Sequence, residues 1–110
     1  MGQKDFDIYF SQFQVRNYKK RWPLIIPGHA VQKIFYIKSG YVRLFSVSRD
    51  GEEITLIIYK PGDFFPLIAA LQQNVPFRYH VETLTHASII SVPVSSFIAF
   101  FEGKPDLLLG

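Results

Sequence analysis

Short β-rich runs, separated by turn residues at fairly regular spacing, fill most of this 110-residue chain. The turns are Pro27-Gly28, Ser39-Gly40, Asp50-Gly51 and Pro61-Gly62. Glycine supplies the backbone conformations that tight turns need, and a hydrophobic period of two indicates strands with one buried face. No helical pattern alternates with the runs, which disfavours a parallel α/β sheet. We therefore predict a mainly β protein, either an antiparallel barrel or a double-sheet jelly roll.

The predicted strands span residues 14–19, 24–26, 33–38, 41–48, 52–59, 64–65, 79–85 and 88–93. Among the connections, Arg49-Asp50-Gly51 is the clearest hairpin turn, because it lies between the two longest runs and places glycine where a positive φ is needed. No internal repeat, low-complexity tract or linker interrupts this pattern.

Helices are predicted at both ends of the strand region. Residues 4–13 carry an aromatic stripe at i, i+3, i+4 and i+7, formed by Phe6, Tyr9, Phe10 and Phe13. We expect this stripe to pack on the main domain. A second helix follows Pro93, with serines near its start and Gly103 at its end.

A further helix is predicted to start at Pro105, and the apolar residues 107–109 follow it directly before the sequence ends. We interpret the chain as a piece of a longer protein or as one that has lost its continuation. A helix of about one turn cannot supply a heptad interface, so we expect a monomer or a weak homodimer.

Composition and length describe one soluble globular unit, and we expect a single domain over residues 1–110. Apolar residues make up 48% of the chain and charged residues 19%, and the longest apolar runs are far too short to cross a bilayer. The first residues lack a hydrophobic signal core, which indicates a cytoplasmic protein. A net charge of +3 is too small to indicate nucleic-acid binding by itself.

Several kinds of chemistry find no support in the residues. The chain has no cysteine, which excludes disulfides, thiolate-bound iron–sulfur clusters and a cysteine redox switch. His29, His80 and His86 show no metal-ligand spacing, so we expect neither a metal nor a cofactor. The sequence shows no plausible nucleophile–base pair, glycine-rich phosphate loop or paired catalytic carboxylates. We therefore do not expect an enzyme.

The order and spacing of five segments resemble the effector domain of the cAMP receptor protein and FNR (Crp-Fnr) superfamily of bacterial transcription regulators. These segments are residues 22–28, 34–44, 50–56, 61–65 and 92–97, and they include Gly40, Gly51 and Gly62 at the family's spacings. The resemblance implies a double-stranded β-helix, a jelly-roll barrel of the cyclic-nucleotide-binding-like kind, with short flanking helices. In that family a dimerisation helix and a DNA-binding helix-turn-helix domain follow, and both are absent from this sequence.

The same resemblance predicts where a cyclic nucleotide would be held. Family members that bind one carry a Gly-Glu pair for the ribose, which falls here on Pro66 and Leu67. They also carry an Arg-Ser pair for the cyclic phosphate, which falls on Phe77 and Arg78. Loss of the carboxylate removes a charge-assisted hydrogen bond, and a one-residue shift on a strand turns the arginine to the opposite face. A change of loop length between residues 72 and 76 would bring Arg78 back to the phosphate position, but it would restore only one of the three polar anchors.

The predicted ligand cradle begins at Pro61-Gly62-Asp63, where a strand ends and a short apolar helix is expected after Pro66. Candidate ligand-binding residues are Leu44, Ile57, Tyr59, Phe64, Phe65, Pro66, Leu67, Ile68, Phe77 and Arg78. Four of these, Leu44, Ile57, Tyr59 and Phe65, are expected to face the barrel interior. The pattern leaves open whether they line a cavity or fill it, and Arg78 also has a plain interpretation as a solvated strand residue.

Two functions compete. The first is a ligand-sensing regulatory domain of a Crp-Fnr-like transcription regulator that responds to an unknown small-molecule effector, not to cAMP or cGMP. Such a chain would not bind DNA alone; a C-terminal domain of the full-length parent would do so. The alternative is a cupin-like small-molecule binding protein or enzyme, which needs a His-x-His metal motif. No His-x-His occurs, and the sensor hypothesis is preferred.

Overall fold

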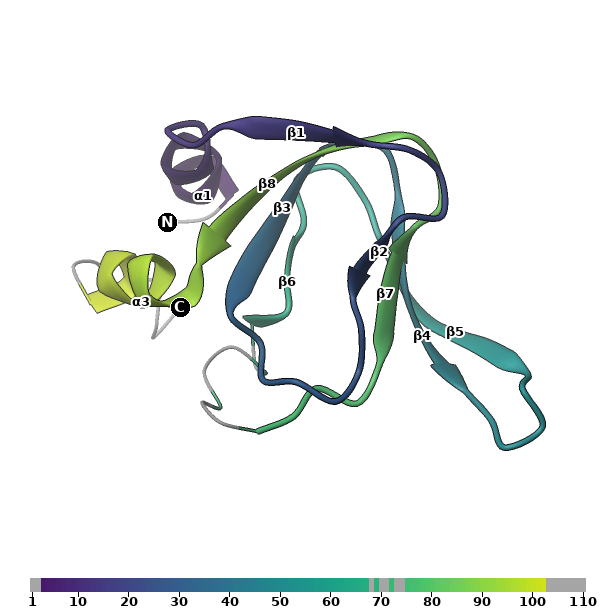
Figure 1. The fold of residues 1–110 in the computed structure, drawn as a ribbon. Helices are drawn as coiled ribbons and strands as arrows, with labels where there is room; N and C mark the ends of the chain where they lie inside the picture. The colour runs from purple at the N-terminus through teal and green to yellow at the C-terminus, as the bar shows by residue number, and fades with distance from the viewer. Residues whose placement is uncertain (1–2, 68, 70–71, 73–74, 103–110) are drawn as a thin grey trace.

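Two four-stranded antiparallel sheets form the body of the protein in the computed structural model, which describes residues 3–67, 69, 72 and 75–102 (Figure 1). The first sheet has the order β1 (Val15–Tyr18), β8 (Ala87–Pro93), β3 (Lys33–Ser39), β6 (Phe64–Phe65). The second has the order β2 (Pro23–Ile25), β7 (His80–Thr83), β4 (Val42–Val47), β5 (Glu53–Tyr59). The predicted mainly β jelly roll is confirmed.

The observed strands lie where the hydrophobic period placed them, with the largest difference at β7. This strand was predicted over residues 79–85, and it spans only His80–Thr83. One further hydrogen bond, from the Leu84 amide to the carbonyl of Tyr41 at 2.8 Å, extends the contact with β4 just beyond the end of the strand. Arg78 and Tyr79 belong to the loop that enters the strand.

Helices α1 (Gln3–Phe10) and α3 (Val94–Glu102) pack together on the outer face of the first sheet (Figure 1). β3 supplies Ile34 and Tyr36 to this contact, and the aromatic stripe of α1 covers them, as predicted. The helix ends at Phe10 and not at Phe13, since the next turn tightens to i→i−3 hydrogen bonds. Phe13 still packs against the cluster.

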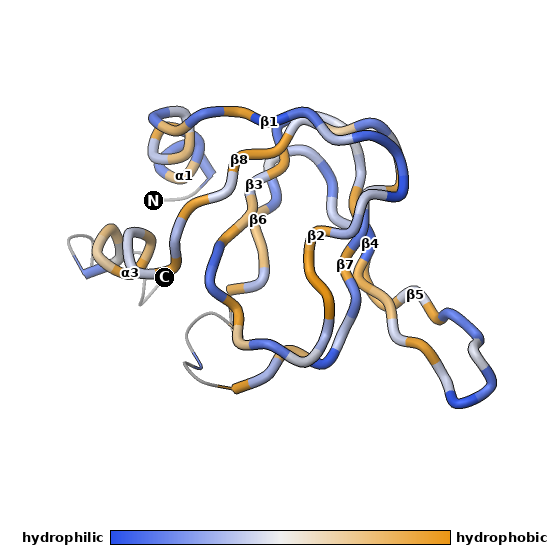
Figure 2. The backbone as a smooth tube through the Cα atoms, in the orientation of Figure 1, coloured by the Kyte–Doolittle hydropathy of each residue, from blue (hydrophilic) through white to orange (hydrophobic). Residues whose placement is uncertain are grey.

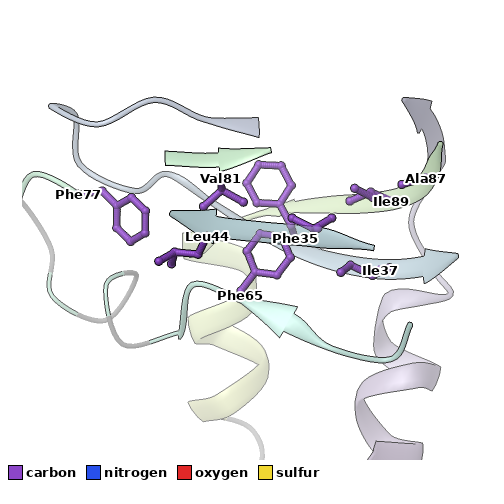
Figure 3. Close-up of a cluster of buried hydrophobic side chains, with 9 residues drawn as sticks. Phe35, Ile37, Leu44, Phe65, Phe77, Val81, Ala87 and Ile89 are labelled. Carbon is purple, nitrogen blue, oxygen red and sulfur yellow. The ribbon is translucent and has the colours of Figure 1, made fainter. Parts of the chain in front are cut away.

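The space between the sheets is filled by a second cluster of side chains from both of them (Figure 3). Phe35 and Ile37 of β3 alternate with the helix-facing pair, and they meet Leu44 of β4 and Val81 of β7. Figure 2 shows orange, hydrophobic stretches along β3 and β8. Burial of this apolar surface is the main driving force for the fold.

The β4–β5 hairpin extends away from the body, and its tip is hydrophilic (Figures 1 and 2). Its turn is the predicted one: Gly51 has φ +83°, and the Ser48 amide donates across it to the carbonyl of Glu52 at 2.8 Å. A bulge in the pairing between Leu44 and Phe45 separates the base of the hairpin from its tip. No helix among the described residues is long and apolar enough to span a membrane.

Asp7 of α1 accepts a hydrogen bond of 2.5 Å from the hydroxyl of Tyr36, which ties the helix to β3. Burial, followed by the hydrogen bond and the charge of Asp7, raises the pKa of Tyr36 from 10.0 to about 12. Because the folded-state pKa is the higher one, this stabilisation is complete below pH 10 and is lost as the pH rises towards 12.

We expect Tyr36→Phe to lower the free energy of unfolding by about 1–2 kcal/mol at neutral pH, because a hydrogen bond to a charged acceptor is lost. The difference from the unmodified protein should shrink between pH 10 and 12. Urea denaturation across that range measures it. A difference that stays constant with pH would show that Tyr36 does not titrate as described.

Candidate functional site

A concave site lies between β5, β6 and the loop that enters β7. We call it the Phe65 pocket; its volume is about 620 Å³, within the usual range of ligand sites. Nine predicted site residues line it: Leu44, Ile57, Tyr59, Phe64, Phe65, Pro66, Leu67, Phe77 and Arg78. Ile68, the tenth, lies outside the described residues, as does most of the helix predicted after Pro66.

The inner wall of the Phe65 pocket is the core itself. Leu44, Phe65 and Phe77 are all buried members of the cluster between the sheets (Figure 3). The Phe65 ring stacks on Tyr59 with centroids 4.3 Å apart and on Phe35 at 5.6 Å. Beside the Phe65 pocket, the barrel interior is therefore filled by its own side chains, and the pocket lies against this filling.

Ile57 was expected to face the interior, and this prediction is wrong. Its side chain is 45% exposed, although it pairs with the buried Leu44 on the same face of the sheet. The β4–β5 hairpin extends away from the body (Figure 1), and among the described residues the side chain of Tyr59, two positions further along the same face of β5, packs on Phe65 while Ile57 stays exposed. Ile57 lines the mouth of the Phe65 pocket and not its core.

Phe64 also differs from its predicted role. Its ring packs on the helix side of the first sheet, with centroids 4.5 Å from Phe6 and 5.7 Å from Phe10. Successive residues of a strand point to opposite faces, so Phe64 and Phe65 serve different clusters. Phe64 contributes only an edge to the pocket.

Phe77 is buried and lines the Phe65 pocket. Its amide donates to the carbonyl of His29 and its carbonyl accepts from the amide of Gly28, both at 2.9 Å, which fixes its register before β7 begins. Arg78 is exposed at the rim of the pocket. Within the described part of the chain, its guanidinium makes no ion pair or hydrogen bond.

The pocket offers few polar groups to a ligand. Burial, followed by the charge of Asp63, raises the pKa of Tyr59, so its phenol is a neutral donor at physiological pH. No acidic residue lies among the described lining residues. The wall would hold an apolar or aromatic body, with Arg78 and Gln72 at the rim.

Sequence reasoning missed six described lining residues: Leu56, Ala69, Gln72, Val75, Pro76 and Tyr79. Tyr79 carried a usable signal in the sequence, since it alternates with Phe77 along the chain. In the structure, its ring meets that of Phe77 edge-on, with centroids 5.8 Å apart. The others lie on the hairpin or in the loop, where no local pattern indicates which way a side chain faces.

A charged cluster on the outer face of the second sheet was also missed. Arg43 donates to Glu82 and to Glu53, each at 2.6 Å, and its guanidinium lies over the Phe45 ring. The hydrogen bond from Arg43 is the main reason that the pKa of Glu53 is lowered. The charges of Arg43, Glu53 and Glu82 are thus paired with one another.

The sequence matches a known protein family over most of its length. The family model described as the cyclic nucleotide-binding domain matches residues 15–104. The cyclic AMP receptor protein of Thermus thermophilus is 32% identical over 67% of this chain and 34% of its own length. A global nitrogen regulator of Nostoc sp. is 24% identical over 84% of this chain and 42% of its own length. The chain thus spans less than half of these relatives.

Solved structures show the same fold. The catabolite activator protein of Thermus thermophilus superposes with a TM-score of 0.78 at 24% identity, over 96% of this chain and 49% of that one. The sensor domain of the transcriptional regulator DNR from Pseudomonas aeruginosa gives a TM-score of 0.79 at 13% identity, over 91% and 67%. Together with the family match, these relatives show that the chain belongs to the cyclic nucleotide-binding domain family, with homologues among Crp-Fnr transcription regulators.

Proposed function

We propose that this chain is the effector-sensing domain of a Crp-Fnr-like transcription regulator and that its effector is neither cAMP nor cGMP. One observation supports this most directly: the nucleotide-anchor positions are occupied by Pro66, Leu67 and Phe77, all of which line the Phe65 pocket. Burying a cyclic phosphate against apolar walls without a paired cation is costly. An apolar or aromatic effector fits the same walls without that cost.

The rest of the functional proposal concerns the parent protein. DNA binding would belong to a separate domain, and this chain alone would associate with DNA only weakly, without sequence preference and in a salt-sensitive way. We propose a cytoplasmic protein. The apolar residues 107–109, on which the assembly hypothesis rests, lie outside the described residues.

No specific observation favours a cupin-like enzyme. Residues 3–67, 69, 72 and 75–102 contain no group of three or more His, Asp or Glu side chains that could hold a metal ion. The jelly roll by itself is shared by many functions and does not decide between them.

Calorimetric titration with cAMP and cGMP tests the effector proposal. We expect dissociation constants well above the micromolar range for both nucleotides. Arg78→Gln provides the informative variant, because Arg78 is the one cationic residue among the described lining residues. Arg49→Gln, at the exposed hairpin turn, is the matched control. Micromolar or tighter binding that Arg78→Gln abolishes and Arg49→Gln preserves would overturn the proposal.

A further inference from the structure

A second pocket lies on another side of the jelly roll, between β2 and the ends of β3 and β8 that lie near residue 33. We call it the Trp22 pocket; its volume is about 510 Å³, and its walls include Tyr18, Trp22, Phe35 and Ser91. It shares no described lining residue with the Phe65 pocket. Its size is sufficient for a ligand of drug-like dimensions.

The pocket exists because the core stops short at this end. Ala87 and Ile89 of β8 fill the space between the sheets, but the next inward position is Ser91. On β3, the position next to Phe35 on the same face of the strand is Lys33, which is exposed. Ser91 and Phe35 are paired across the two strands, so a small polar group and an aromatic wall lie next to each other.

The walls favour a flat aromatic ligand. Phe35 is only 7% exposed and forms the floor, while Trp22 is 43% exposed. The Tyr18 and Trp22 rings lie 6.4 Å apart between centroids and are tilted by 42°. Aromatic walls of this kind contribute offset and edge-on contacts to a planar ring.

The charge around the pocket favours an anionic group on that ligand. Lys33 lies at the rim, and none of the described lining residues is acidic. Lys19 adds a second cation, with its Nζ 5.6 Å from the centre of the Trp22 ring. In the part of the chain that the structure describes, neither Lys33 nor the Ser91 hydroxyl has a hydrogen-bond or ion-pair partner.

From these features we propose that the Trp22 pocket is a second small-molecule site, which takes a planar aromatic carboxylate. The ring would lie against Phe35 and Trp22, and the carboxylate would face Lys33. This inference does not depend on the effector of the Phe65 pocket. Two stacked rings, with centroids 5.6 Å apart, separate the two sites: Phe35 lines the Trp22 pocket and Phe65 lines the Phe65 pocket.

Heteronuclear NMR titration of the whole chain with naphthoate tests the proposal. The chain has a single tryptophan, so one indole N–H resonance reports on this pocket. We expect saturable shifts of the Trp22 indole and of the Ser91 and Phe35 amides. Neutral naphthamide, which has the same shape, should bind about five-fold more weakly because it lacks the charge that Lys33 attracts.

Variants separate a built site from general surface binding. Lys33→Gln should remove the preference for naphthoate, whereas Lys38→Gln, an exposed residue on the same strand, should keep it. Ser91→Leu should abolish binding by filling the pocket, and the two lysine variants still test the site if that variant does not fold. Shifts confined to Leu44, Phe77 and Arg78, the absence of saturation, or equal affinity for naphthoate and naphthamide would each overturn the proposal.

Discussion

Replacing Gly40 with alanine is expected to destabilise the protein by about 3–5 kcal/mol. Gly40 has φ +87°, a conformation that costs any residue with a Cβ. An added Cβ would also lie 2.4 Å from the carbonyl oxygen of His86 and 2.7 Å from the Cα of Ala87. These are backbone atoms at and just before the start of β8, so relief requires the backbone of this segment or of the β3–β4 turn to shift. The loss is comparable with the total stability of many domains.

Gly51→Ala separates the two causes. Gly51 has nearly the same backbone conformation, φ +83°, but nothing lies within 4 Å of its would-be Cβ. It should therefore lose only the conformational contribution, about 1–2 kcal/mol. Guanidinium denaturation of both variants measures the difference. Equal losses at the two positions would contradict the close approach of β8 to Gly40.

Phe10→Ala is expected to cost about 3–5 kcal/mol, because it removes a fully buried ring from the contact between α1 and the first sheet. The ring stacks on Tyr36 at 4.6 Å and on Phe97 of α3 at 5.8 Å between centroids. Its loss would leave a cavity that both helices line. Thermal and denaturant unfolding of the variant measure the effect.

Ile8→Ala is the matched control on the same helix. Ile8 is 55% exposed, so its truncation should change the stability by no more than about 0.5 kcal/mol. If the two variants lose similar amounts, α1 is not docked on the barrel through its aromatic face. If Phe10→Ala loses little, the helix contributes nothing to the stability of the body.

The hydrophobic period and the turn residues were sufficient to predict a mainly β fold, and the family resemblance then selected the double-stranded β-helix. Alternation along β3 places Phe35 and Ile37 on one face and Ile34 and Tyr36 on the other, and the structure buries both sets. The turn glycines, including Gly51, mark where the chain reverses, since few other residues accept a positive φ. The spacing of α1 predicted which of its faces would be buried.

The local sequence pattern also predicted most of the residues of the candidate site, but it did not predict which of them would be buried. Nine of the proposed residues line one pocket because a turn and two strand ends meet there. Alternation assigns a side chain to one of two faces, and it says nothing of what covers that face. Ile57 has the sequence signature of a buried residue, yet the projecting hairpin leaves it exposed.

Only the tertiary structure decided the contacts between distant segments. Arg43 and Glu82 lie 39 residues apart in the sequence, and the pairing of β4 with β7 brings their charges together. The Trp22 pocket likewise requires β2 to lie beside β3 and β8 without a bulky residue at Ser91. The sequence determines which faces are apolar through short-range periodicity. Cavities and ion pairs arise from long-range packing, where each side chain depends on neighbours that no local pattern specifies.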